Sequence, residues 1–179
     1  QKWLEWHRLA APGTIACAAG HSTCGAPSRQ VEVAHLAAVI PQAPYLGRSI
    51  ELIGSEPVRH RGTVVGSLTH GDPAGELPAV AVLMQADSEV QSITGGLRTV
   101  AADDFFAERF APRLAADELV TRVRFPYLDA THQFAIEETQ RRYNSLAVAG
   151  AAAHVVHSNG RVDSAAVVVF GVADCPKRV

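Results

Sequence analysis

The residues best suited to chemistry lie in a glycine-rich segment over residues 58–78. Gly62 and Gly66 let the backbone approach a ligand closely, and Thr63 and Ser67 add hydroxyl donors beside exposed N–H groups. A loop of this kind suits a diphosphate, which needs several donors and tolerates little side-chain bulk. Glu76 follows Gly66 by ten residues and is placed to accept hydrogen bonds from ribose hydroxyls, as acidic residues do in dinucleotide sites. The spacing alone also fits a plain surface loop before a helix, so both interpretations stay open.

Other groups of reactive residues favour no catalytic or metal site. Among the eight histidines, the one close pair is His154 and His157, which stand in an apolar context without a nearby cysteine or suitable acid. Glu137 and Glu138 are adjacent, and adjacent residues of a strand point to opposite faces, so they do not form an acid/base pair. We expect no catalytic residue and no metal ligand in this chain.

The three cysteines are Cys17, Cys24 and Cys175. This odd number, with six residues between the first two, fits neither a disulfide framework nor the usual zinc spacing. Reduced thiols, as in a cytoplasmic protein, are the simpler interpretation.

Composition indicates a globular chain of about one domain. Of 179 residues, 47% are hydrophobic and 19% are charged, which argues against disorder because enough apolar surface is available to offset chain entropy. Sixteen Lys and Arg against 18 Asp and Glu leave a net charge of −2, without the basic field that nucleic-acid binding needs. No apolar run reaches the roughly 20 residues of a membrane span, and residues 1–8 are too charged for an export signal. We expect a cytoplasmic protein, and we expect a piece of a longer chain because the sequence starts without methionine.

The pattern of apolar residues predicts helices and strands in irregular alternation. We expect helices from residue 28 to the prolines at 41 and 44, over 44–54, over 77–84 and starting at 101. The stretch 54–78 is too polar for a core strand and too rich in glycine for a stable helix, so we expect a loop.

The strands form a second set. A hairpin is expected at Gly95-Gly96 between strands over 86–94 and 98–100, with further strands over 119–126, 134–139 and 162–172 and a buried alanine-rich element over 145–157. In the strand over 119–126, Leu119, Thr121, Val123 and Phe125 should face one side and Val120, Arg122 and Arg124 the other. The order of elements predicts an α+β fold.

The glycine-rich segment resembles the second FAD-binding stretch of the medium, flavin-carrying subunit of molybdenum hydroxylases, the family of carbon monoxide dehydrogenase and xanthine dehydrogenase. That family's pattern is Arg-Asn-Arg-Gly-Thr-Ile-Gly-Gly-Ser-Leu, then His-x-Asp-Pro and an acidic residue before Leu-Pro. The present sequence reads Arg59-His60-Arg61-Gly62-Thr63-Val64-Val65-Gly66-Ser67-Leu68, then His70-Gly71-Asp72-Pro73 and Glu76-Leu77-Pro78. Further matches follow in order at 98–106, 117–126 and 134–150, so the resemblance covers about residues 28–179.

The resemblance implies a domain organisation and a set of flavin contacts. Residues 1–130 would be mostly the second subdomain of a PCMH-type FAD-binding domain, and residues 131–179 the start of the α+β C-terminal flavoprotein domain. The implied diphosphate site, which lies near the isoalloxazine, consists of Thr63, Val64, Val65, Gly66 and Ser67. Glu76 would lie on the adenosine side, and Val120 and Glu137 would contact the flavin part.

The sequence departs from the family at several points. Val65 stands where the family has glycine, and its branched side chain is expected to shift the backbone or weaken FAD binding. Ser145 stands where the family has aspartate. The family's first FAD loop, Ala-Gly-Gly with a polar pair, has only an echo in Ala19-Gly20-His21-Ser22, so half of the flavin cradle is expected to be absent.

The function implied by the resemblance is that of an oxidoreductase subunit in a heterotrimer. Electrons would pass from a molybdopterin-binding large subunit through a [2Fe-2S] small subunit to FAD on this chain, and then to an external acceptor. The chain would not hydroxylate substrate, and its sequence specifies neither the substrate nor the acceptor. The alternative is a non-catalytic structural or assembly subunit with a degenerate flavin site, which Val65 and the missing first loop favour.

Overall fold

The computed structural model describes residues 15–18, 20–36 and 43–179 of the chain. Six short helices and eleven strands occur in these ranges. The helices are α1 (Gln30–His35), α3 (Pro44–Leu52), α4 (Glu56–Arg61), α5 (Val64–His70), α6 (Glu76–Leu83) and α7 (Ala102–Phe105). The strands are β1 (Ile15–Ala18), β2 (His21–Gly25), β3 (Asp87–Ser92), β4 (Gly96–Ala101), β5 (Phe106–Glu108), β6 (Ala111–Pro112), β7 (Glu118–Pro126), β8 (His132–Gln140), β9 (Ala147–Ser158), β10 (Arg161–Phe170) and β11 (Lys177–Arg178).

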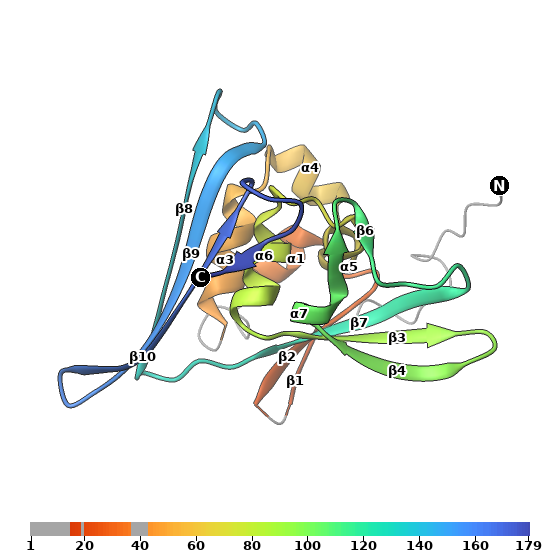
Figure 1. The fold of residues 1–179 in the computed structure, drawn as a ribbon, viewed down its shortest axis with the longest axis horizontal. Helices are drawn as coiled ribbons and strands as arrows, with labels where there is room; N and C mark the ends of the chain where they lie inside the picture. The colour runs from red at the N-terminus through yellow and green to blue at the C-terminus, as the bar shows by residue number, and fades with distance from the viewer. Residues whose placement is uncertain (1–14, 19, 37–42) are drawn as a thin grey trace.

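Two main antiparallel sheets enclose a helical layer. The larger sheet has the strand order β1-β2-β7-β3-β4, the second has the order β11-β10-β9-β8, and β5 pairs with β6 in a small separate ribbon. In Figure 1 the second sheet runs along one side of α1, α3 and α6, and the strands of the larger sheet pass below them. The α+β fold that the sequence predicts is confirmed.

Helix α6 forms the centre of the core. All eight of its residues are buried, and it packs against α3, α5, α7 and the strands β9, β10 and β11. A helix that is apolar on every side must be buried on every side, which explains its place between the two sheets. The expected helix over 77–84 is therefore confirmed, with its start one residue earlier at Glu76.

The expected loop over 54–78 is wrong, because most of it forms α4, α5 and the start of α6. Its glycines lie where helices tolerate them. Gly62 and Gly71 flank helix ends, Gly71 with a φ of +63°, and Gly66 lies on the exposed side of α5. Val64 and Leu68, one helical turn apart, are buried and hold α5 against the core. Packing of this apolar side outweighs the poor helix propensity of the segment.

The predicted alternation along residues 119–126 is also wrong in one detail. Glu89 of β3 pairs with Arg122 and Val90 pairs with Val120, so Thr121 is an extra residue in β7, a β-bulge. The bulge turns Val120 to the same buried side as Val123 and Phe125, whereas Leu119 is exposed.

The alanine-rich stretch forms a strand, β9, that is less buried than expected. Within it, Ala147 and Ala152 are the buried residues. The strand pairs with β8 on one side and with β10 on the other, so its backbone is central in the second sheet even where its side chains are accessible.

The chain passes from the larger sheet to the second sheet between Pro126 and His132. Tyr45 of α3 lies at this passage, donates its hydroxyl to the Pro126 carbonyl at 2.5 Å, and packs its ring against Phe125 and Phe134. The division into two domains at residue 130 stays a prediction. In the described ranges, no helix is long and apolar enough to cross a membrane.

Candidate functional site

The N-terminus of α5 presents backbone donors at the position where the sequence predicts a ligand. Thr63 is the N-cap, and its Oγ1 accepts the Gly66 N–H at 3.0 Å. The Val64 N–H is used by the Ser28 carbonyl at 3.1 Å. Within the described part of the chain, the Val65 N–H has no hydrogen-bond acceptor, so it remains available at the positive end of the helix dipole.

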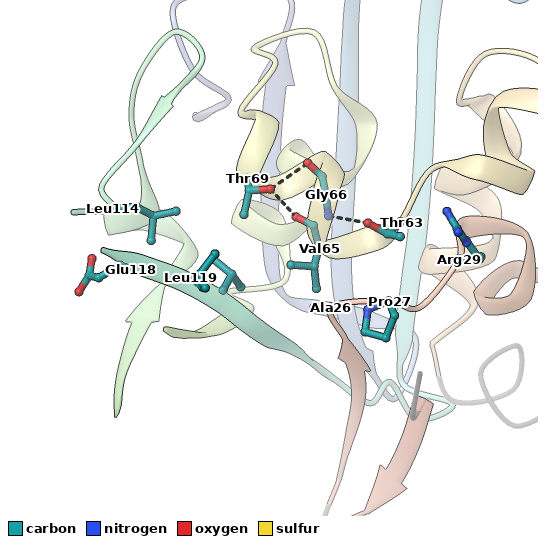
Figure 2. Close-up of a pocket in the computed structure, with 11 residues that line it drawn as sticks. Ala26, Pro27, Arg29, Thr63, Val65, Gly66, Thr69, Leu114, Glu118 and Leu119 are labelled. Atoms are coloured by element: carbon teal, nitrogen blue, oxygen red, sulfur yellow. Dashed lines mark hydrogen bonds between the residues drawn. The ribbon is translucent and has the colours of Figure 1, made fainter. Parts of the chain in front are cut away.

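A cavity of about 400 Å³ lies beside this helix end. Three parts of the chain form its walls: the connection from β2 to α1, helix α5 with its cap, and the start of β7 with the segment before it (Figure 2). The lining residues are Ala26, Pro27, Arg29, Thr63, Val65, Gly66, Thr69, Leu114, Glu118, Leu119 and Val120. Their mix of apolar walls with a few polar groups is typical of a small-molecule site.

The two ends of the cavity differ in charge. Arg29 lies at one end near Thr63 (Figure 2). Its guanidinium donates to the Arg61 carbonyl. Glu118 lies at the other end and is held by Arg98 through two hydrogen bonds of 2.6 and 2.7 Å. The hydrogen bonds from Arg98, with that from the Ala115 N–H, lower the pKa of Glu118 to about 2. At the Glu118 end, Arg98 is used in the pair with Glu118. The end near Arg29 carries a positive charge, so it is the end suited to an anion.

At two glycines next to the cavity, an added side chain would press on a neighbouring side chain. A Cβ at Gly66 would lie 2.6 Å from the Thr63 Oγ1 and would disturb the cap of α5. A Cβ at Gly62 would lie 2.8 to 2.9 Å from the carboxamide of Gln30. Gln30 is buried and donates to the Ser67 Oγ at 2.7 Å, which fixes α1 against α5.

The structure brings together most of the residues that the resemblance assigns to the flavin. Thr63, Val65, Gly66 and Val120 line the cavity. Ser67 lies behind them in its hydrogen bond with Gln30, and the Val64 side chain is buried in the core, so Val64 offers only its backbone. Val65 has a helical backbone and a side chain that is 4% exposed, so its methyl groups pack into the wall of the cavity.

Two predicted site residues lie elsewhere. Glu76 is the first residue of α6 and is 7% exposed, and burial is the main cause that raises its pKa to about 8, with the negative charge of Glu138 adding to it. Glu137 is exposed on β8, 3.8 Å from Arg48 of α3. Neither residue lines the cavity, and their assignment to flavin contacts stays a prediction.

The described residues in the echo of a first FAD loop lie at the start of β2. Ala19 lies outside the described residues, and Gly20 has a φ of +81° in the turn that leads into β2. His21 and Ser22 pair with Pro126 and Phe125 of β7. None of these three residues lines the cavity.

Arg29 and Gln30 are the site residues that sequence reasoning missed. Their importance arises from an isolated bridge between Arg29 and Thr63, which places the start of α1 beside α5. Two backbone hydrogen bonds support it, from Gln30 to Gly62 and from Val64 to Ser28. No local sequence pattern indicates a contact between residues more than thirty positions apart, so the sequence did not predict it.

Comparison with known proteins identifies a family and relatives of this chain. A family model described as "FAD binding domain in molybdopterin dehydrogenase" matches residues 6–128. The nicotine 6-hydroxylase medium subunit of Paenarthrobacter nicotinovorans is 34% identical over 142 residues, which are 79% of this chain and 49% of the relative. The carbon monoxide dehydrogenase medium chain of Afipia carboxidovorans is 31% identical over 135 residues, 74% of this chain and 46% of the relative. The chain thus spans about half the length of these relatives.

Solved structures share the fold. A carbon monoxide dehydrogenase chain from Hydrogenophaga pseudoflava matches with a TM-score of 0.88 and 28% identity, over 92% of this chain and 57% of that chain. A chain of quinoline 2-oxidoreductase from Pseudomonas putida 86 matches with a TM-score of 0.86 and 27% identity, over the same shares.

Proposed function

The chain belongs to the family of FAD binding domains in molybdopterin dehydrogenases, and on that premise we propose that it is the FAD-binding, electron-transfer part of a molybdenum hydroxylase medium subunit. The observation that carries this proposal is the cavity at the N-terminus of α5, where donors, a glycine and a cation converge. The whole protein would be an oxidoreductase subunit.

The residues around the cavity fit the diphosphate of FAD. The first turn of α5 offers the Val65 N–H and the helix dipole, Arg29 offers a guanidinium, and Gly66 borders the cavity with its backbone alone. Thr63 keeps the helix end in place by its capping hydrogen bond. This donor set binds an anion without a metal ion.

The other walls of the cavity suit the flavin. Val65, Leu119 and Val120 form an apolar side that excludes water from a bound ring. When bound, FAD accepts and releases electrons one or two at a time, and the protein's part is to bind, orient and shield it. Glu76 and Glu137 would join this site only if a ligand reached beyond the cavity.

The partners follow from the same proposal. A molybdopterin-binding large subunit would oxidise the substrate, a [2Fe-2S] small subunit would relay the electrons, and an external acceptor would receive them from this chain. The medium subunits named above motivate this arrangement. The substrate would be determined by the large subunit. We place the complex in the cytoplasm, on the composition and on the reduced state expected of the cysteines.

The alternative is a structural or assembly subunit that has lost its flavin, and Val65 is the observation that favours it. The visible absorption spectrum of the purified complex that contains this chain separates the two functions. We expect flavin bands beside those of the iron–sulfur centres, with FAD released on denaturation. Iron–sulfur bands without flavin, in a complex isolated under several conditions, would support the structural subunit instead.

Truncation of Val65 tests whether this residue obstructs the site. Because its side chain packs in the wall and the proposed diphosphate contacts are the Val65 N–H and the Arg29 guanidinium, Val65→Ala is expected to lower the free energy of unfolding by about 1–3 kcal/mol and to leave FAD occupancy within about twofold. Val80→Ala in α6 is the matched control, since it removes the same buried methyl groups at a residue that does not line the cavity. A several-fold rise in occupancy in Val65→Ala alone would mean that the valine blocks FAD.

A further inference from the structure

A second, larger hollow on the surface shares no lining residue with the cavity beside α5. Its volume is about 980 Å³, and Arg109, Arg141 and Arg142 line it, so we call it the arginine groove. Binding residues concentrate on loops that a rigid scaffold holds in place, which makes the groove a candidate site. Its walls come from four turns, at residues 72–74 between α5 and α6, 109–110 between β5 and β6, 141–142 and 145–148 from β8 into β9, and 171–174 between β10 and β11.

The three guanidinium groups have no acidic partner among the described residues. The ion pairs found there involve other arginines and none of Arg109, Arg141 and Arg142. Asp72 and Asp174 also line the groove, but neither lies within ion-pair distance of these arginines. The Asp72 Oδ1 instead accepts a backbone N–H of its own turn at 2.9 Å. The groove therefore holds positive charge that an anionic partner would complement.

The walls near the arginines are apolar and open to solvent. Phe110, Leu146 and Val172 line the groove, and between 48% and 72% of each side chain is exposed. Arg109 lies over the Phe110 ring, 5.6 Å from its centroid, so a cation and an aromatic ring form one surface. Exposed apolar side chains rimmed by charge mark interaction surfaces, and arginine and aromatic residues are enriched where proteins bind each other.

This composition fits a protein partner better than a small anion. A small-molecule site encloses its ligand and orients it by a few precisely placed polar groups. None of the residues that line the groove carries a buried side-chain polar atom without a partner. The three arginines instead lie at exposed positions on two separate turns. The complementary surface is one with several carboxylates around an apolar side chain.

The groove adjoins the candidate site. Thr69 of α5 lines the cavity, and Asp72, three positions further along the chain, lines the groove. The Cα atoms of these two residues are therefore at most about 11 Å apart. His70 lies between them, and its ring packs against that of Phe110 at 5.0 Å between centroids. A protein that docks in the groove thus comes close to whatever the cavity holds.

We propose that the arginine groove is the docking surface of the external electron acceptor, and that this acceptor is a protein with carboxylates around an apolar contact. The proposal rests on the proposed electron-transfer function, because it supplies the partner that takes electrons from FAD. The acceptor takes one electron in each encounter, so two encounters return FADH2 to FAD and release two protons to water. Such encounters use small, transient interfaces, and opposite charges raise their rate of association more than their affinity.

Succinylated cytochrome c is the probe, because succinylation turns its lysines into carboxylates and keeps its haem. Native cytochrome c, which is basic, is the matched control. The complex that contains this chain is photoreduced with EDTA in the absence of oxygen and mixed with each cytochrome, and the haem absorption gives the second-order rate constant. At low ionic strength we expect the succinylated form to react at least about tenfold faster than the native form, and we expect this ratio to approach one in about 1 M salt.

The double variant Arg141→Ala/Arg142→Ala tests whether the groove causes this preference. We expect it to lose about tenfold in the rate with succinylated cytochrome c at low ionic strength and to keep its flavin content. Arg161→Ala is the matched control, since this exposed arginine at the start of β10 does not line the groove, and the rate should change by less than about twofold. No loss in the double variant, or an equal loss in Arg161→Ala, would overturn the proposal.

A binding measurement without flavin separates the docking surface from the proposed FAD function. The affinity of the flavin-depleted complex for succinylated cytochrome c, measured by calorimetric titration, should fall in the double variant and stay unchanged in Arg161→Ala. A complex isolated without flavin would contradict the electron-transfer function, whereas equal affinities of wild type and double variant would contradict the docking surface. Inorganic pyrophosphate should compete no better than sodium chloride at the same ionic strength. Stronger competition that the double variant abolishes would make the groove a small-anion site and overturn the proposal.

Discussion

Replacing Gly66 with aspartate is expected to abolish FAD binding and to leave the fold intact. The new carboxylate would stand in the first turn of α5, on the exposed side where the proposed diphosphate lies. Two unit charges about 4 Å apart repel by about 4 kcal/mol at an effective dielectric constant of about 20, which is about a thousandfold in affinity. This is the largest effect on ligand binding that we expect from one substitution in the chain.

The same substitution should not harm α5. Acidic residues in the first turn of a helix interact favourably with its dipole, by about 0.3–1 kcal/mol. The new Cβ would press on the Thr63 Oγ1, at 2.6 Å, but this hydroxyl belongs to an exposed side chain that can rotate, at the cost of the capping bond of about 1 kcal/mol. The two terms nearly cancel, so the unfolding temperature should change little.

Gly66→Asn is the matched control because asparagine has the size of aspartate without its charge. FAD titration of the flavin-depleted complex should give a dissociation constant raised about a thousandfold in Gly66→Asp and at most about tenfold in Gly66→Asn. Equal losses would mean that bulk and not charge matters, and thus that no anion binds there. Unchanged affinity in both variants would remove the diphosphate from the N-terminus of α5.

The parts of the fold that the sequence predicts are those decided by local patterns. The hairpin of β3 and β4 follows from two short polar–apolar strands around Gly95-Gly96, and α6 follows from a continuous apolar run. In both cases neighbours in sequence are neighbours in space, so composition over a few residues determines the outcome.

The failures have non-local causes. The glycines and polar residues of 54–78 suggest a loop, but buried Val64 and Leu68 bind α5 to the core and make it a helix. The bulge at Thr121 arises from pairing with β3, where Thr121 donates to the Glu89 carbonyl and carboxylate. Neither effect is visible in the segment itself, since the deciding partner lies elsewhere in the chain.

In the candidate site, too, residues within one motif were predicted and a residue placed by a non-local contact was missed. The resemblance pointed to residues 63–67 and Val120, of which the structure brings Thr63, Val65, Gly66 and Val120 to one cavity from two separate parts of the chain. It could not identify Arg29, because that cation reaches the cavity only through the bridge to Thr63. The spacing from Gly66 favoured a ribose contact for Glu76, which stays a prediction: this residue is 7% exposed at the start of α6 and does not line the cavity.

The largest expected effect on stability comes from Gly150→Ala in β9. Gly150 pairs with Phe170 of β10, and the ring of Phe170 lies directly over it. A Cβ at residue 150 would lie 2.1 Å from the Phe170 Cζ and 2.6 Å from both Cε atoms. Because Phe170 is fully buried, its ring has no free direction in which to move.

We therefore expect Gly150→Ala to lower the free energy of unfolding by about 3 kcal/mol, at the upper end of the usual cost of overpacking. For a chain of this size the loss corresponds to an unfolding temperature lower by roughly 6–12 °C, measured by calorimetry or circular dichroism. Ala151→Val, on an exposed position of the same strand, is the control and should change stability by less than about 0.5 kcal/mol.

A double-mutant cycle with Phe170→Leu separates the ring clash from other effects of the alanine. Leucine lacks the ring atoms that approach residue 150, so Gly150→Ala should cost much less in the Phe170→Leu background, with a coupling energy of about 1–3 kcal/mol. Additive effects would show that backbone conformation, and not the contact with the ring, requires glycine. The contact also bears on the core, because Gly150 and Phe170 lie in β9 and β10, two of the three strands that α6 packs against.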